Sequence, residues 1–200
     1  MFNLPVSVQH ISGPLLVLLS CWLFFLLTPV SYELLAYERD LVTQQQWWRL
    51  ISGNFLHTNF NHLLLNSAGV ILLWALHGQY FTAKSYLLYV CLLCIATTLG
   101  IYSFAPQLLW YVGLSGALHG LFILGAYFDI TEGLKSGWLL MIAVLAKVIH
   151  EQVYGASDEI ATLIHAKVAI DAHLFGSLAA IVVILALSSY TLFGRKFLTK

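Results

Sequence analysis

Long apolar stretches separated by short polar connections run along most of the chain. Most of these stretches are close to the ~20 residues that a helix needs to cross the hydrocarbon core of a bilayer. We therefore predict an all-α membrane protein, with one domain over residues 1–200 that crosses the membrane six times. One stretch is short for a full crossing, so we expect its start to lie below the membrane surface, sheltered by protein. The spans are expected at about 14–31, 60–78, 85–104, 115–129 (the short one), 138–154 and 168–189.

The composition agrees with a membrane location. Hydrophobic residues make up 60% of the chain and charged residues only 9%, against roughly 25% charged residues in an average soluble domain. Such a chain is too apolar to be disordered, and it has too little polar surface for a soluble globular domain. The 9 basic and 9 acidic residues balance, which gives no electrostatic reason to expect nucleic acid as a partner. The expected surrounding is the lipid bilayer.

The distribution of basic residues predicts the orientation of the helices. With six spans, both ends of the chain lie on one side of the membrane. Five basic residues fall on that side and three on the other, so the positive-inside rule places both termini in the cytoplasm. The five are Lys84, Lys135, Arg195, Lys196 and Lys200, and the three are Arg39, Arg49 and Lys167.

All three cysteines lie in apolar stretches. Cys91 and Cys94 have the spacing of a redox or zinc pair, but no second pair accompanies them and both fall in the middle of a predicted span. We expect them, like Cys21, to fill space among apolar side chains. No metal or other cofactor is expected.

Four polar side chains are expected at a similar depth in the membrane. Polar groups inside spans are costly and usually functional. The second, fourth and sixth spans run in the same direction, so residues near their starts meet on the non-cytoplasmic side. His62 and Asn66 lie near the start of the second span on one helix face, although they could simply tie that span to a loop. Ser115 begins the fourth span, and His173 lies in the first third of the sixth.

The surroundings of Ser115 suit a nucleophile. Gly113 and Gly116 flank it, and the start of a helix offers free N–H groups to an oxyanion. His173 is the candidate base by its depth, and a small-residue face at Gly176 would let the sixth span pack closely on the fourth. Glycine and serine are also ordinary packing residues in membrane helices, and an intramembrane histidine can be a hydrogen-bonded structural group.

Ordered motifs along the chain resemble those of the rhomboid intramembrane serine proteases. The resemblance extends from about Gln46 to Ala180. It implies a bundle of six transmembrane helices with a membrane-embedded first loop. The motifs are Gln46–Ile51 with its Trp-Arg pair, Phe55–His57, the His-x-x-x-Asn pattern of His62–Asn66, Gly113–Gly116 and Ala172–Gly176.

The resemblance also implies a role for each matching residue. Ser115 is the expected nucleophile and His173 the expected base of a catalytic dyad. The oxyanion is expected to bind the backbone N–H of Ser115 and the side chains of His62 and Asn66. The residues expected to shape or support this pocket are Gly113, Leu114, Gly116 and His119, and those expected to anchor the first loop are Trp48, Arg49 and His57.

One position departs from the common rhomboid pattern and points to a subgroup. Rhomboids often have a tyrosine four residues after the serine, where this chain has His119. With the sequence Asp171–Gly176 and the short chain, this is similar to the rhombosortases. That resemblance implies protein sorting in a bacterial inner membrane, on exported single-span proteins that carry a GlyGly-CTERM tail. His119 could stack on His173, hydrogen-bond to it, or reach Ser115 itself.

The fifth span carries an unusual set of polar residues, Lys147, His150 and Glu151. Lys147 and Glu151 are four residues apart and are expected to pair on one helix face. The pair could be structural, or the set could recognise a polar feature of a substrate at a lateral gate. Asp171 is not expected to reach the ring of His173, because residues two apart on a helix point in nearly opposite directions.

Three other functions are compatible with parts of the sequence. A rhomboid-like membrane protein without catalysis would bind its partners by the same fold. A bis-histidine haem protein could use His77 and His150, or His62 and His173, as axial ligands. A metal-dependent protease is disfavoured because His150-Glu151 lacks the second histidine of the His-Glu-x-x-His motif.

Overall fold

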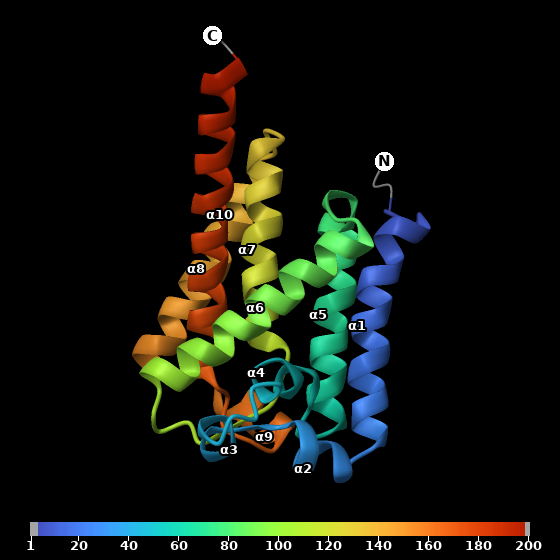
Figure 1. Cartoon of the computed structure of the whole chain (residues 1–200), viewed down its shortest axis with the longest axis vertical. Coiled ribbons are helices and arrows are strands. Elements are labelled where there is room, and N and C mark those ends of the chain that lie inside the picture. The colour runs from blue at the N-terminus through green and yellow to red at the C-terminus, as the bar shows by residue number, and fades with distance from the viewer. Residues whose placement is uncertain (1–3, 199–200) are drawn as a thin grey trace.

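The computed structural model describes the backbone of residues 4–198 and the side chains of residues 4–189. Lys200, and the side chains of Arg195 and Lys196 that entered the orientation argument, lie outside the described residues. The fold is mostly helical (Figure 1). Its long helices are α1 (Val8–Leu26), α5 (Phe60–His77), α6 (Ala83–Phe104), α7 (Ser115–Thr131), α8 (Lys135–Tyr154) and α10 (Ile170–Leu198).

Five segments of the described chain are long and apolar enough to cross a membrane. They are Val8–Leu26, Phe60–Tyr80, Ala83–Phe104, Lys135–Tyr154 and Ile170–Ser189. Helix α7 has 17 residues, which at ~1.5 Å per residue gives about 25 Å, less than the ~30 Å hydrocarbon core. The predicted short fourth stretch therefore agrees with the structure, and five of the six predicted spans correspond to segments long and apolar enough to cross a membrane.

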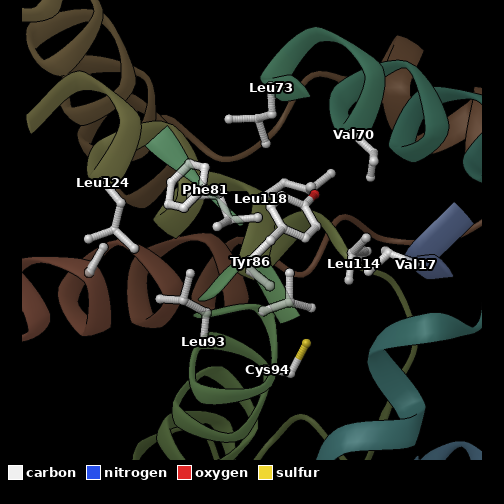
Figure 2. Packing of buried hydrophobic residues seen from close by; sticks show 14 of the residues in the cluster. Val17, Val70, Leu73, Phe81, Tyr86, Leu93, Cys94, Leu114, Leu118 and Leu124 are labelled. Carbon is white, nitrogen blue, oxygen red and sulfur yellow. The ribbon is translucent and has the colours of Figure 1, made fainter. Parts of the chain in front are cut away.

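Helix α7 lies at the centre of the bundle. Ten of its 17 residues are buried, whereas only three of the 20 residues of α8 are. Figure 2 shows Leu118 of α7, and Leu114 just before this helix, among side chains of α1, α5 and α6, including Cys94. Because protein surrounds α7, it has no need of the full length of a lipid-facing span. Cys21 and Cys94 are free and buried in this cluster, as expected.

The first helix differs from its predicted position. A span was expected at 14–31, but α1 runs from Val8 to Leu26. Its first turns contain Gln9, His10 and Ser12, and these polar residues lowered the hydropathy that located the span. At the other end, Pro29 disfavours helical backbone at the residue before it, so the chain leaves the helix there.

Most of the short elements connect the long helices at one end of the bundle. The first connection holds α2 (Val30–Leu35), α3 (Arg39–Thr43), α4 (Arg49–Ser52) and the 3-10 turn η1 (Gly53–Phe55), and a second 3-10 turn, η2 (Gly78–Tyr80), follows α5. Two short strands, β1 (Tyr37–Glu38) and β2 (Trp110–Tyr111), pair antiparallel. The connection between the predicted spans 138–154 and 168–189 contains α9 (Asp158–Ile164). The start of α1 and the end of α10 lie at the opposite end of the bundle (Figure 1).

Glycines bring α7 and α10 into backbone contact. A Cβ atom built on Gly176 would overlap the carbonyl oxygen of Gly116, and one on Gly120 would lie 2.7 Å from the carbonyl oxygen of Gly176. No larger residue fits at this crossing without moving one helix away from the other. The predicted packing of the sixth span on the fourth through Gly176 is thus confirmed.

Candidate active site

Ser115 is the first residue of α7, directly after a strained turn. Gly113 has φ +128°, a conformation that favours glycine. A Cβ there would also lie 2.9 Å from Nε2 of His62. Leu114 precedes the helix and provides no side-chain cap, so the helix begins with N–H groups that have no intrahelical partner. The positive end of the helix dipole lies at the serine.

Backbone contacts with the first connection hold this turn in place. The N–H of Gly113 donates to the carbonyl of Gly53 at 3.2 Å. The hydroxyl of Tyr111 donates to the carbonyl of Gly113 at 2.5 Å, and Tyr111 itself is paired with Tyr37 across the two strands. The first connection thus positions the start of α7, although it is far away in sequence.

Ser115 and His173 are in hydrogen-bond contact. The distance from Ser115 Oγ to His173 Nε2 is 2.9 Å, within the range required of a nucleophile and its base. His173 is buried in the first turn of α10. The glycine contact between α7 and α10 lies next to Ser115 and His173, because Gly116 follows the serine and Gly176 lies one turn after the histidine.

The other ring nitrogen of His173 contacts a carboxylate. Glu151 Oε2 lies 2.8 Å from Nδ1, and Glu151 Oε1 accepts from Lys147 Nζ at 2.8 Å. Lys147 Nζ is also 3.3 Å from Nδ1. An ionised carboxylate can only accept, so Nδ1 carries the proton and Nε2 is left to accept from the serine. The predicted pair of Lys147 and Glu151 is confirmed, but its link to His173 was not foreseen.

His119 stacks on His173. The ring centroids are 4.1 Å apart and the planes 22° from parallel. Nδ1 of His119 lies 2.7 Å from the carbonyl oxygen of Ser115, which makes it the donor. Of the three alternatives for His119, the structure shows stacking on the imidazole, together with a backbone contact one turn back along α7.

His62 and Asn66 line the same site from α5. Thr58 contacts Nδ1 of His62 through its hydroxyl, at 3.0 Å, and through its N–H, at 3.4 Å. The Nε2 side of the ring lies by the turn at Gly113. Asn66 donates one amide N–H to the carbonyl of His62 at 3.2 Å, and its second N–H is available to a ligand.

His57 lies behind His62. Its ring is fully buried and meets the ring of His62 edge-on, with centroids 5.0 Å apart. Its backbone carbonyl accepts a hydrogen bond from the hydroxyl of Tyr32. Burial, and next the neighbouring His62, lowers the pKa of His57 from 6.5 to about 3, so this ring is neutral at physiological pH.

A cleft of about 690 Å³ opens on these groups. Its walls come from α5, α7, α8, α9 and α10, and most of the lining is apolar. His150, whose ring lies 4.9 Å from that of Tyr154 and tilted by 42°, is exposed on this cleft. The polar residues that line the cleft include Ser115, His173, His62, Asn66, His119, Lys147 and Glu151.

Trp48 and Arg49 lie in the first connection and contact its backbone. The buried guanidinium of Arg49 donates to the carbonyls of Ala36 and Glu33, each at 2.6 Å. The indole N–H of Trp48 donates to the carbonyl of Leu34 at 3.0 Å. Both side chains therefore join α4 to the end of α2, away from the cleft.

The remaining polar positions do not join the site. The Asp171 carboxylate accepts from Gln107 at 3.1 Å. This agrees with the expectation that Asp171 does not reach the ring of His173. His77 lies at the other end of α5, 3.3 Å from Asp129. His77 and Asp129 line a separate cleft of about 900 Å³, which lacks the serine and its base.

The imidazole cluster contains three side chains of types that can bind a metal ion. Donor atoms of His119, Glu151 and His173 lie within 4.8 Å of one another. The carboxylate oxygens are already bound to His173 and Lys147. The stacked rings are nearly parallel, so their nitrogen lone pairs do not converge on one point.

Sequence reasoning missed Glu151 as the partner of His173, although the signal was present. Glu151 lies three residues before the end of α8, and His173 lies three residues after the start of α10. These two helices are consecutive membrane spans and run antiparallel, so such positions lie at the same depth. Thr58, which contacts His62, was also missed, because a threonine in a connection carries no distinctive pattern.

The chain is similar to known proteins in two comparisons. Residues 44–190 match the model of the Rhomboid domain family. The chain is also 36% identical over 108 residues to a protein of Bacillus subtilis (strain 168) named "Putative rhomboid protease YdcA". That match covers 50% of this chain and 53% of the relative, so it spans about half the length of each.

Proposed function

We propose, from the premise that this chain belongs to the rhomboid family, that it is a serine endopeptidase acting within the membrane through Ser115 and His173. Membership of the family implies an intramembrane protease, and the five apolar helices agree with an integral membrane protein. The observation that carries the serine mechanism is the 2.9 Å contact between Ser115 Oγ and His173 Nε2 at the start of α7.

The geometry supports a two-step acyl transfer. Ser115 Oγ attacks the carbonyl carbon of the scissile peptide while its proton passes to Nε2 of His173. When the tetrahedral intermediate collapses, the C–N bond breaks and the same proton goes to the leaving amine. Water then enters, gives a proton to Nε2, and its oxygen replaces Ser115 on the acyl group. The serine leaves with a proton returned by His173.

The oxyanion has candidate donors on two helices. The N–H of Ser115 has no intrahelical partner and lies at the positive end of the α7 dipole. The free amide N–H of Asn66 and Nε2 of His62, which lines the same cleft, supply the other side. One such donor typically contributes about 10²–10³ in rate, so each is expected to matter on that scale.

The proposed substrates are single-span membrane proteins. The cleft has an apolar lining and is walled partly by α5 and α8, which suits a hydrophobic segment entering sideways. Each glycine weakens a helix by roughly 1 kcal/mol relative to alanine, so a glycine pair beside the span would help expose the scissile bond. We propose GlyGly-CTERM tails as the class of substrate, by the resemblance to rhombosortases that His119 supports.

The same proposal includes a location. Both termini are proposed to lie in the cytoplasm and the cleft toward the other side of a bacterial inner membrane. The basic residues Lys84 and Lys135, in the first turns of α6 and α8 at the terminal end of the bundle, support this orientation.

Co-expression with a single-span reporter tests the function. The reporter carries a GlyGly sequence, a hydrophobic span and a basic end, and its matched control has AlaAla in place of GlyGly. We expect cleavage of the first reporter by the wild type, loss of cleavage in both Ser115→Ala and His173→Ala, and slower cleavage of the control. Equal cleavage of both reporters would remove the GlyGly preference while keeping the protease. Cleavage by Ser115→Ala would overturn the proposed nucleophile.

A further inference from the structure

We propose that Glu151 is a positioning residue that extends the serine–histidine pair to a chain of three, Ser115–His173–Glu151. The inference rests on the proposed function. The hydrogen bonds of the Glu151 carboxylate go to His173 and Lys147 and not to Ser115, so it acts on the serine through the imidazole. Its role is to fix the tautomer and orientation of His173 and to face the positive charge that forms on the ring during proton transfer.

Both ring nitrogens of His173 are engaged, each by a different partner. Nε2 lies 2.9 Å from Ser115 Oγ, and Nδ1 lies 2.8 Å from Glu151 Oε2. A neutral imidazole has one N–H, so a donor at Nδ1 makes Nε2 the acceptor. That is the tautomer in which His173 can take a proton from the serine, and the carboxylate selects it.

Lys147 also lies near Nδ1 of His173, but farther from it than Glu151. Its Nζ is 3.3 Å from Nδ1, whereas Glu151 Oε2 is 2.8 Å away. Lys147 donates to the other carboxylate oxygen at 2.8 Å, which holds the carboxylate turned toward the ring. The side chain of Lys147 is 47% exposed and that of Glu151 11%. The lysine therefore faces the cleft, while the carboxylate faces the histidine.

The helices that carry the two groups are tied together beside them. Gln152, next to Glu151, donates to the carbonyl of Ile170 at 3.1 Å. Ile170 begins α10 one turn before His173. The bond from Glu151 to His173, at 2.8 Å, is charge-assisted, and such bonds are strong in a buried site. Glu151 therefore holds the ring in one position relative to α7.

The charged and titratable groups around His173 come from three helices. Glu151 and Lys147 face it from α8, His119 from α7 and His62 from α5. On its own helix, Asp171 is bound to Gln107 instead. Within the described residues, Glu151 is the carboxylate in hydrogen-bond contact with the ring.

Kinetics of Glu151→Gln against the wild type test the role. We expect kcat to fall by up to about 10⁴-fold, the loss seen when the carboxylate of a serine–histidine–carboxylate set is replaced, with KM little changed. The acidic limb of the kcat–pH profile should move to lower pH, because the imidazolium loses its counter-charge. Glu151→Asp should recover part of the rate. The matched control is Glu132→Gln, at an exposed carboxylate after α7, and should behave as wild type.

A second readout does not depend on activity. In protein labelled with ¹⁵N-histidine and carrying Ser115→Ala, we expect the His173 ring to show the Nδ1–H tautomer, and the additional change Glu151→Gln to abolish that preference. Labelling of the wild type by a fluorophosphonate tests the proposed function separately. No labelling together with the Nδ1–H tautomer would count against the protease and leave the positioning role intact.

Two results would overturn the role of Glu151. One is a Glu151→Gln enzyme that keeps its kcat within about 3-fold of wild type, with the same pH profile. The other is a His173 tautomer unchanged by that substitution. If Glu151→Gln unfolds at a much lower temperature than wild type, the comparison of Glu151→Asp with wild type decides by the same two criteria.

Discussion

The glycine crossing of α7 and α10 gives a quantitative prediction for Gly176→Ala. The added methyl group would overlap the carbonyl oxygen of Gly116 and lie 3.1 Å from the hydroxyl of Thr97. Backbone atoms cannot move aside as a flexible side chain would. To reach even 3.0 Å, the shortest distance that real Cβ contacts show, the two helices must separate by roughly 1 Å. Such overpacking costs about 1–3 kcal/mol of stability.

The separation acts directly on the catalytic pair. The Ser115–His173 contact of 2.9 Å would lengthen toward ~4 Å, beyond the range for efficient proton transfer. A misplacement of ~1 Å can cost about 10² in rate. We therefore expect Gly176→Ala to react with a fluorophosphonate about 10²-fold more slowly while it still folds.

The assay is the rate of fluorophosphonate labelling, measured beside thermal unfolding in detergent. Leu185→Ala is the control on the same helix, at a side chain that is 61% exposed, and should label at the wild-type rate. If Gly176→Ala labels at the wild-type rate and unfolds at the wild-type temperature, the two helices do not cross as closely as described, and the reasoning fails.

Three further predictions concern the surroundings of the site. Gly113→Ala combines a strained φ of +128° with a Cβ 2.9 Å from His62 Nε2, so its labelling rate should fall by about 10² with a small loss of stability; an unchanged rate would count against this turn as part of the site. Arg49→Met removes the donor to the buried carbonyl of Ala36 and the partly buried carbonyl of Glu33. An unpaired buried carbonyl costs about 1–3 kcal/mol, so the unfolding temperature should drop clearly; a drop no larger than that of Leu185→Ala would contradict the anchor role. Burial holds the pKa of His57 at about 3, against 6.5 for the free side chain. Between these values the unfolded chain binds one more proton than the folded protein, so the free energy of unfolding of the wild type falls as the pH falls from 6.5 toward 3. His57→Gln should lose less stability over this range, and parallel curves of stability against pH for the two proteins would refute this.

Much of the fold could be predicted because long runs of apolar residues mark membrane helices directly in the sequence. The positions of α5, α6 and α8 agree with runs of apolar residues to within a few residues. The start of α1 was predicted wrongly, since Gln9 and His10 lie inside the helix despite their polarity. Helix α9 was treated as loop, because its seven residues after Ser157 are too short for a clear period.

The candidate site could be predicted only in part. The proximity of Ser115 and His173 followed from depth and from the direction of the spans, and the structure brings the two into contact. The link between Glu151 and His173 did not follow, because depth alone does not tell which way a side chain turns around its helix. That rotation is set by packing between helices, through contacts such as those of Gly116 and Gly176.

The measurement that tests the account most directly is mass mapping of a fluorophosphonate adduct on the purified, folded protein. The account predicts an adduct on Ser115 in the wild type, no adduct in Ser115→Ala, and labelling slower by about 10²–10⁴ in His173→Ala, which lacks the base. An adduct on another residue, or a His173→Ala protein that labels as fast as the wild type, would contradict it.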